Sequence, residues 1–382
     1  MKTEFKSKKT INTSIFKTYK SDCINCKKCV NICPFLQEYI KSPKSFINDL
    51  ENSSIDINLP YYCSLCSCCK RVCPKDIDLG QLFFLLREEI TTTNNGKTPI
   101  KGHKAMDFHQ NFSNNTIFKG VYGKKNTKKF FMPGCSLNGY SPNLSLKTYN
   151  YLKEKLGDVG LILNCCNKPT KDLGKRDLFD KRFSQFISSL KKFNNDDIEI
   201  ITACQSCFRV LKDETKDIKI TSLWSLFSEI GIPKKSIGKG LDSNLTFSIK
   251  DSCQGLDYKE IGDGIRYVVE SLGYNLNSKD VTNNCCGLGG IVHLSNPVLS
   301  KKTKDNCINS LNSDDVITYC GGCLSAINNS DKNSYHILEL IFEDEDTLFV
   351  DRKVNISALS SWKNRYKIKK DLVKEDLHLE KK

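Results

Sequence analysis

The sequence predicts an α+β fold, in which a mostly helical N-terminal domain precedes two copies of an α/β domain. Three observations lead to this prediction. Cysteine-rich runs lie near the N-terminus, separated by apolar residues at helical spacing. From residue 129 onward, short apolar runs alternate with amphipathic stretches, as in α/β layers with parallel strands. The order of these elements recurs from residue 241, which indicates internal duplication.

Changes in composition define six segments. They are a basic lead-in at 1–20, a cysteine-rich domain at 21–95, a linker at 96–128, the first repeat at 129–240, the second repeat at 241–348 and a charged tail at 349–382. We expect the lead-in to be loosely held. The linker is rich in Asn, Thr, Gly and Lys, and the tail carries an isolated Trp362 and follows the acidic run 343–346. A solvated tail is the expectation.

The protein is expected to be cytoplasmic, because no apolar run follows the N-terminal charges and none is long enough to span a bilayer. Peripheral association with a membrane through a partner stays open. The chain contains 20 cysteines. In a reducing compartment, such a number favours metal binding over a disulfide framework.

The first cysteine run has the spacing C-x₂-C-x₂-C-x₃-C-P, which is that of bacterial ferredoxins. Its members are Cys23, Cys26, Cys29, Cys33 and Pro34. Two intervening residues let a loop wrap around one face of a cubane, so that three thiolates reach three irons. The fourth cysteine starts a helix and points toward a second cluster, and the proline occupies an early helical position where a missing N–H costs little.

The same spacing recurs at residues 63–74, which predicts a ferredoxin-type domain with two [4Fe–4S] clusters. If the runs cross over as in ferredoxins, Cys23, Cys26, Cys29 and Cys73 hold cluster 1, and Cys63, Cys66, Cys69 and Cys33 hold cluster 2. Cys68 falls between ligand positions and is expected to be spare. Zinc sites are the alternative, but zinc usually takes two separated pairs of ligands.

Within the repeats, the expected strands and helices place further cysteines at strand ends. The expected strands are 129–132, 161–163, 198–202, 245–249 and 316–318, and the expected helices are 144–156, 258–272 and 298–311. Cysteines follow the C-terminal ends of most of these strands, which is where open α/β sheets bind ligands.

Each repeat contains a single cysteine, an adjacent pair and a C-x-x-C, in that order. The first set is Cys135, Cys165, Cys166, Cys204 and Cys207, and the second is Cys253, Cys285, Cys286, Cys320 and Cys323. Five thiolates exceed the four ligands of zinc and the four irons of a regular cubane. An enlarged or opened iron–sulfur cluster fits better. Ordinary cubanes, zinc or buried free thiols are the alternatives, and Cys307 is expected to be a buried free thiol.

Two ferredoxin runs followed by two copies of this pattern resemble the catalytic subunit of heterodisulfide reductase in its fused form. The pattern also resembles the iron–sulfur subunits of glycolate oxidase and anaerobic glycerol-3-phosphate dehydrogenase. The resemblance covers about residues 21–345 and includes the stretch 132–137. It implies two cysteine-rich CCG domains, each with a non-cubane [4Fe–4S] cluster, that face a shared cleft where a disulfide is split by one-electron steps. All ten positions are filled, but Asn167 stands where the family has glycine.

Two functions follow from these sites. One is an iron–sulfur oxidoreductase that reduces a disulfide or a similar two-electron acceptor. The alternative is the electron-transfer subunit of a flavin-dependent dehydrogenase for a small hydroxy acid or polyol phosphate. The chain shows no flavin or nicotinamide motif, since Gly262-Asp263-Gly264 lacks the third glycine and the preceding strand. We therefore expect a flavoprotein or other redox partner. Catalytic residues are not predicted, although His293 follows the second Gly-rich turn and is a candidate neighbour of a cluster.

The formal net charge of +14 raises a third possibility, a nucleic-acid binder. However, bound cysteines are thiolates. With 18 of them on four cores of about +2 each, the net charge falls to about +4. No basic patch with interleaved aromatic residues is present in the sequence, so no nucleic-acid partner is expected.

Overall fold

The computed structural model describes residues 3–194, 197–277, 283–328, 330–344, 348–349 and 357–379. It contains helices and both parallel and antiparallel strands, which confirms the α+β class. The chain divides into two compact units. The first comprises Met1–Gln110, Asn167–Lys181 and Asn283–Ser310, and the second comprises Asn111–Cys166, Arg182–Thr282 and Leu311–Lys382. Each cysteine pair therefore lies at or near a point where the chain passes between units.

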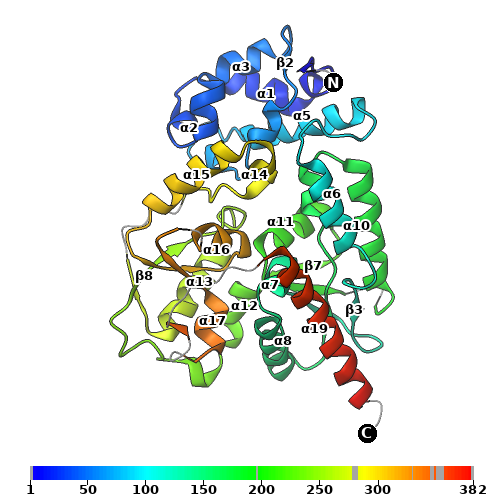
Figure 1. The fold of residues 1–382 in the computed structure, drawn as a ribbon, viewed down its shortest axis with the longest axis vertical. Helices are drawn as coiled ribbons and strands as arrows, with labels where there is room; N and C mark the ends of the chain where they lie inside the picture. Colours follow the sequence, from blue (N-terminus) through cyan, green and yellow to red (C-terminus); the bar gives the residue numbers. More distant parts are fainter. Residues whose placement is uncertain are drawn as a thin grey trace. The chain divides into compact units, whose positions relative to one another are not determined.

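The first unit is mostly helical (Figure 1). Its α-helices are α1 (Ser14–Asp22), α2 (Lys28–Asn31), α3 (Pro43–Asp49), α4 (Cys68–Arg71), α5 (Leu79–Thr93), α9 (Lys168–Asp172), α14 (Val292–Ser295) and α15 (Pro297–Asn309). Single turns of other helix types are η1 (Thr10–Asn12), η2 (Leu36–Ile40), η3 (Leu59–Tyr62) and η5 (Gly289–Ile291). Strands β1 (Glu4–Phe5) and β2 (Ile55–Asp56) pair antiparallel.

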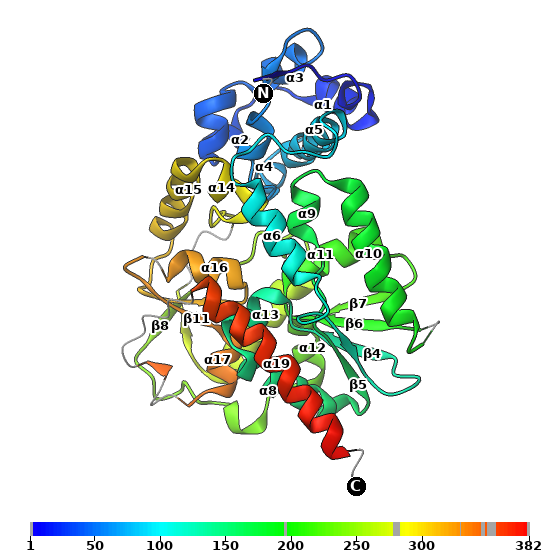
Figure 2. The same cartoon turned by 45° about the vertical axis from the view of Figure 1, so that its right-hand side comes forward.

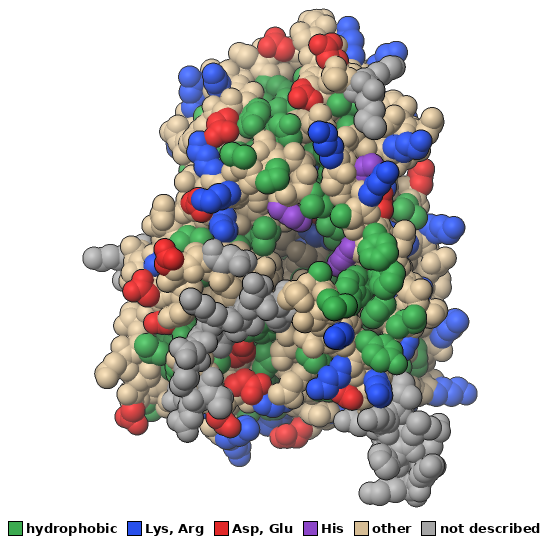
Figure 3. Space-filling model, viewed as in Figure 1, with side chains coloured by type: hydrophobic (Ala, Val, Ile, Leu, Met, Phe, Trp, Pro, Cys, Tyr) green, Lys and Arg blue, Asp and Glu red, His purple; other side chains and the backbone are tan. Residues whose placement is uncertain are grey.

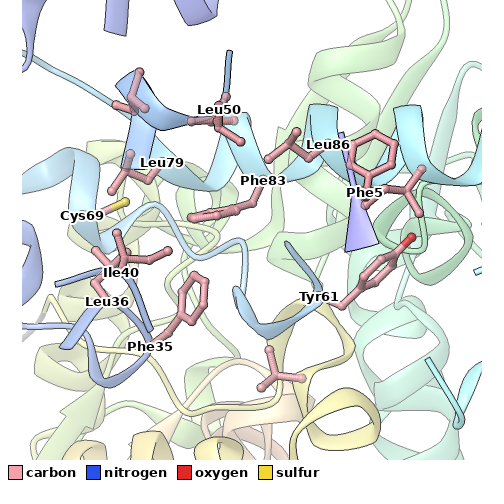
Figure 4. Packing of buried hydrophobic residues seen from close by; sticks show 14 of the residues in the cluster. Phe5, Phe35, Leu36, Ile40, Leu50, Tyr61, Cys69, Leu79, Phe83 and Leu86 are labelled. Atoms are coloured by element: carbon pink, nitrogen blue, oxygen red, sulfur yellow. The ribbon is translucent and has the colours of Figure 1, made fainter. Parts of the chain in front are cut away.

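Helix α5 organises the core of this unit. It begins at Leu79 because the Asp78 side chain accepts a hydrogen bond from the Gly80 N–H. Its apolar residues recur at helical spacing and bury one face of the helix. Figure 4 shows Phe83 of this face near Phe35, and their ring centroids are 5.0 Å apart. Burial of one such side chain stabilises the fold by about 1.5–3 kcal/mol.

The second unit contains two sheets. The first has the order β3-β5-β4-β6-β7, with strands β3 (Val121–Tyr122), β4 (Lys129–Met132), β5 (Val159–Ile162), β6 (Glu199–Thr202) and β7 (Lys219–Ser222). The other has the order β11-β10-β8-β9, with strands β8 (Thr246–Lys250), β9 (Asn275–Leu276), β10 (Asp315–Thr318) and β11 (Asn333–His336). Figure 2 shows the strands of the first sheet side by side. Apart from β3, every pairing is parallel.

The two sheets share one topology, which supports the predicted duplication. Strands β5-β4-β6-β7 correspond in order and direction to β9-β8-β10-β11. Their helices are α7 (Cys135–Tyr140), α8 (Pro142–Leu156), α11 (Gln205–Glu214), α12 (Leu223–Ile230), α13 (Lys259–Leu272), α16 (Gly321–Ile327), α17 (Ile337–Phe342) and α19 (Ala358–Leu379), with η4 (Lys234–Ser236) between them. Strands β7 and β11 were not predicted, because three of the four residues in each are polar.

Three segments differ from the expectations. The lead-in is packed rather than loose, since Phe5 and Phe16 are buried and α1 forms. The segment expected to be a linker contains α6 (His103–Ser113) and β3. Elsewhere, the long helix α10 (Arg176–Lys191) follows α9. The prediction of a solvated tail is wrong for the part of the tail that the structure describes. There, α19 packs against α7 and α8, and Ile368 is buried. Residues 345–347 and 350–356 lie outside the described residues.

The charged sequence of α19 concealed its apolar face. Arg365, Ile368 and Leu372 are buried at helical spacing among lysines. The Trp362 ring lies 4.8 Å from the Phe118 ring and 5.4 Å from the Phe112 ring, measured between centroids. These contacts explain why the helix is held although most of its residues are polar.

Glu89 of α5 fastens the lead-in to the core. Its carboxylate accepts hydrogen bonds from the Ser7 hydroxyl (2.8 Å) and from the backbone N–H groups of Lys8 (2.5 Å), Lys9 (2.7 Å) and Thr10 (2.9 Å). Burial opposes ionisation of Glu89, but the hydrogen bonds outweigh it and lower its pKa.

We expect Glu89→Gln to lower the free energy of unfolding by about 1–3 kcal/mol at pH 7. A carboxylate with a lowered folded-state pKa contributes stability above its unfolded pKa and loses it as pH falls through the folded value. The difference from wild type should therefore shrink below about pH 4. Thermal unfolding at pH 7 and pH 3 measures it, with the exposed Glu229→Gln as control. Equal differences at both pH values would contradict the prediction.

Candidate metal centres

The four cysteines predicted for cluster 1 line one cavity. Cys23, Cys26 and Cys29 come from the first run and Cys73 from the second, so the structure brings together the crossed set that ferredoxin spacing predicts. The cavity reaches the surface, because Ile24 in its wall is 60% exposed and Cys26 is exposed. Lys27 and Lys75 also line it.

Both runs share an unusual backbone. In each C-x-x-C, the residue before the second cysteine has a positive φ (Asn25 at 54°, Leu65 at 51°), and so does the residue after it (Lys27 at 60°, Ser67 at 56°). Non-glycine residues seldom adopt this conformation. Left-handed residues alternating with others form concave arrays of N–H groups that bind anions. The loops are therefore shaped to surround a negatively charged object.

Three of the cysteines predicted for cluster 2 also lie close together. Cys33, Cys63 and Cys69 interact electrostatically, and burial raises the pKa of the Cys63 thiol to about 12 while Arg87 opposes this rise. The fourth, Cys66, accepts a 2.7 Å hydrogen bond at its carbonyl from Arg71. Cys68 is buried, and its sulfur lies 3.5 Å from an Arg71 nitrogen.

All five cysteines of the first repeat form one hydrogen-bonded group. Cys135 is bonded to Cys165, Cys165 to Cys166, Cys166 to Cys207, and Cys207 to Cys204. Hydrogen bonds from Cys165 and Cys207 lower the pKa of Cys166 to about 6. The bond to Cys165 raises the pKa of Cys135, and the bonds to Cys166 and Cys204 raise the pKa of Cys207. The group follows strands β4, β5 and β6, which are adjacent and parallel and so end at one sheet edge.

The cysteines of the second repeat are divided between the units. Cys253, Cys320 and Cys323 belong to the second unit, and Cys285 and Cys286 to the first. Cys320 caps α16 and is hydrogen-bonded to Cys323, which lowers its pKa to about 6. None of the twenty cysteines, all of which lie within the described residues, forms a disulfide. Within the described residues, no three Cys, His, Asp or Glu side chains converge enough to hold a single metal ion. A four-iron cluster differs from such a site, since each thiolate binds a different iron.

Within the second unit, the two repeats meet beside their cysteines. Helix α7 begins at Cys135 and contacts α16, which begins directly after Cys320. The approach is close, since a Cβ added to Gly321 would lie 2.7 Å from the Cβ of Ser136. The cysteines that begin these two helices are therefore neighbours.

Asn167 takes the backbone conformation that glycine takes in the second repeat. Its φ is 60°, and that of Gly287 is 77°. Asparagine is one of the few other residues that visits the left-handed region readily. In the second repeat, an added Cβ on Gly287 would lie 2.4 Å from the Ser300 carbonyl oxygen, so a side chain is excluded there. The departure at Asn167 thus leaves the turn intact.

An ion pair with a buried carboxylate, in the chain next to cysteines of the second set, was not predicted. The Asp251 carboxylate receives hydrogen bonds from the Arg266 guanidinium (2.7 and 2.6 Å) and from the Tyr319 hydroxyl (2.9 Å). Asp251 is two residues from Cys253, and Tyr319 precedes Cys320. The corresponding positions of the first repeat are Pro133 and Ala203, so the two sites differ in charge. The sequence signal for this group was a pair of charged residues, Lys250 and Asp251, at the end of an otherwise mostly apolar strand.

Two remaining side chains lie outside these groups. Cys307 is buried, and its sulfur lies 3.6 Å from the Asn284 side-chain oxygen, in agreement with its expected role as a core thiol. His293 lies on α14, is exposed at its surface, and has its pKa lowered by partial burial. Its proximity to a cluster stays a prediction.

The fold and the cysteine groups together define an iron–sulfur redox protein. Residues 19–77 match the family described as a 4Fe-4S dicluster domain, and residues 130–212 and 249–328 each match a cysteine-rich domain of the CCG type. The chain belongs to the iron–sulfur proteins that join a dicluster domain to two cysteine-rich domains, which confirms the resemblance to the heterodisulfide reductase family.

Three relatives match this protein over most of its chain. An uncharacterized iron–sulfur protein of Methanococcus maripaludis is 25% identical over 79% of this chain and 66% of its own length. Another, from Methanocaldococcus jannaschii, is 22% identical over 89% of this chain and 72% of its own. One subunit of the fumarate reductase (CoM/CoB) of Methanothermobacter marburgensis is 24% identical over 84% of this chain and 71% of its own. Among the described helices, none is long and apolar enough to cross a membrane.

Proposed function

We propose that the protein is an iron–sulfur oxidoreductase, acting as a subunit of a complex, that reduces a disulfide or a similar two-electron acceptor at its cysteine-rich repeats. The observation that carries this proposal is the single hydrogen-bonded group formed by all five cysteines of the first repeat. A purely structural role does not require five thiols to converge at a sheet edge.

The proposed ligands are the sets predicted from sequence. Cluster 1 would be held by Cys23, Cys26, Cys29 and Cys73, and cluster 2 by Cys33, Cys63, Cys66 and Cys69. Each five-cysteine set would hold a non-cubane [4Fe–4S] cluster. When bound, these groups supply one-electron transfer. Cleavage of a disulfide takes up two electrons and two protons and yields two thiols, and the electrons would come from a reduced partner protein.

The protein's own residues would shape both ends of the path. At cluster 1, the exposed Cys26 and the lysines of the cavity leave a surface that a redox partner can approach. At the repeats, α7 begins at Cys135, and α11 and α16 begin directly after Cys204 and Cys320, so the positive ends of three helices would favour a negatively charged cluster there. The contact between α7 and α16 supports a site shared by the two repeats.

Purified anaerobically, the protein should contain about sixteen irons, as four four-iron clusters require. On oxidation it should give an EPR signal that shifts when a thiol or disulfide is added. Cys307→Ser, which changes a buried cysteine outside both sets, should retain the iron and the shift. A full iron content without any thiol-dependent signal would count against disulfide reduction.

An electron-transfer subunit of a flavin-dependent dehydrogenase is the second candidate. It is favoured by the relative named as a subunit of a fumarate reductase, which indicates assembly with other chains. This candidate predicts co-purification with a flavoprotein that reduces the clusters, and no response to thiols. Nucleic acid is not a proposed partner, and on the face shown in Figure 3 basic side chains are interspersed with acidic ones.

A further inference from the structure

Arg87 is a fully buried cation whose hydrogen-bond acceptors are backbone carbonyls. It lies on α5, and its guanidinium donates to the carbonyl oxygens of Pro60 (3.0 Å), Asp172 (2.7 Å), Gly290 (3.1 Å) and Cys63 (2.6 Å). Removing a positive charge from water costs several kcal/mol even after relaxation. Four neutral carbonyls accept from four of its five N–H groups. Its charge also interacts with Cys63, with the Asp172 carboxylate and with the Tyr61 ring, whose centroid lies 5.0 Å from the guanidinium carbon.

Three of these carbonyls belong to segments that carry proposed cluster ligands or follow them directly. Cys63 is a proposed ligand of cluster 2. Gly290 lies in the turn that follows Cys285 and Cys286, and Asp172 ends the helix that follows Cys166. One guanidinium therefore joins the loop of cluster 2 to the segments behind both cysteine pairs.

The turn of the second repeat packs directly on the loop of cluster 2. A Cβ added to Gly290 would lie 2.4 Å from the Cys63 carbonyl oxygen, and one added to Gly289 would lie 2.6 Å from that of Ser64. Ile291, next in the chain, has φ of 60°, which is strained for a β-branched residue. Such strain persists only where the surrounding structure enforces it.

A second arginine makes a parallel connection. Arg71 donates to the Cys66 carbonyl (2.7 Å) and to the Asn283 side chain (2.8 Å), and Asn283 donates to the Cys68 carbonyl (3.3 Å). The first run has the exposed Asn31 at the position of Arg71. Arg71 therefore gives the loop of cluster 2 a cationic contact, and the loop of cluster 1 has no arginine at the same position.

We propose that Arg87 is a positioning residue that holds the loop of cluster 2 and the Gly-rich turn of the second repeat together through its hydrogen bonds. Its positive charge also raises the reduction potential of cluster 2 above that of cluster 1. The reason is electrostatic. Reduction adds one negative charge to a cluster, and a nearby buried cation stabilises that charge in a medium of low polarity. Electrons that enter at the exposed cluster 1 would then pass to cluster 2 and leave toward the second repeat. This inference rests on the proposed assignment of the two cubanes.

The test is an anaerobic redox titration of the full-length protein, with soluble mediators and EPR detection. At the wild-type midpoint of cluster 2, Arg87→Gln should lower the ratio of reduced to oxidised cluster about tenfold, which for one electron corresponds to 59 mV. Cluster 1 should be unchanged. Arg87→Lys keeps the charge and should keep most of the potential. Arg176→Gln is the matched control, because Arg176 is in the same unit and pairs with Asp180 instead.

Equal potentials in Arg87→Gln and wild type would overturn the proposal, as would equal shifts of both cubanes. If Arg87→Gln fails to fold, Arg71→Gln decides: a smaller shift of cluster 2 in the same direction supports the proposal, and no shift overturns it. Mediators replace the natural donor and acceptor, so the result does not depend on whether the acceptor is a disulfide. If the wild-type protein does not show two cubane signals, the result would instead contradict the proposed function.

Discussion

Replacing Cys207 with serine should remove about four of the roughly sixteen irons expected for the loaded protein. Cys207 is fully buried and is bonded to both Cys166 and Cys204 in the thiol group. Serine has nearly the same shape, but its hydroxyl oxygen is a harder and poorer ligand for the iron of a cluster than a thiolate. The cluster of the first repeat should therefore fail to assemble.

The clusters of the ferredoxin-type domain should remain, because their ligands lie in the other unit. Iron per polypeptide and the EPR spectrum of the reduced protein measure both effects. Cys307→Ser is the matched control, since Cys307 is as buried as Cys207 but belongs to neither set. Unchanged iron content in Cys207→Ser would show that the first set does not hold a cluster through this residue.

Trp224→Ala should lower the free energy of unfolding by about 3–5 kcal/mol. Trp224 lies on α12, is fully buried, and packs its ring 5.8 Å from that of Tyr319 and 6.1 Å from that of His336. Truncation to alanine leaves a cavity between α12 and the end of the second sheet. Because domains of this kind are stable by only about 5–15 kcal/mol, the loss is a large fraction of the total.

Trp224→Phe should cost much less. Phenylalanine retains an aromatic ring, and the Trp224 ring N–H has no hydrogen-bond partner within the described residues, so no bond is lost. Urea unfolding of the two variants measures the difference, and Leu241→Ala, at a residue that is 74% exposed, is the control. A cost below about 1 kcal/mol for Trp224→Ala would show that the site collapses around the missing ring.

Ligand spacing was readable from sequence because it is a local property. A thiolate loop must meet several irons within a few residues, so the run at Cys23 and its copy at Cys63 predict their chemistry without a fold. The strands β4, β6, β8 and β10 were equally readable, since each is a short, largely apolar run that is followed within three residues by a cysteine. Both signals depend on residues that are neighbours in the chain.

Contacts between segments that are distant in the sequence could be decided only from the tertiary structure. Nothing near Arg87 in the sequence distinguishes it from a solvated arginine, yet it bonds to Gly290, some two hundred residues away. Likewise, α19 reads as a solvated charged tail until α7 and α8 are present to cover its apolar face. The physical reason is that burial and the cost of a buried charge are set by whatever surrounds a residue. The cysteines by themselves determined which metal chemistry to expect, and the fold determined that the loop of cluster 2 meets the turn behind Cys286.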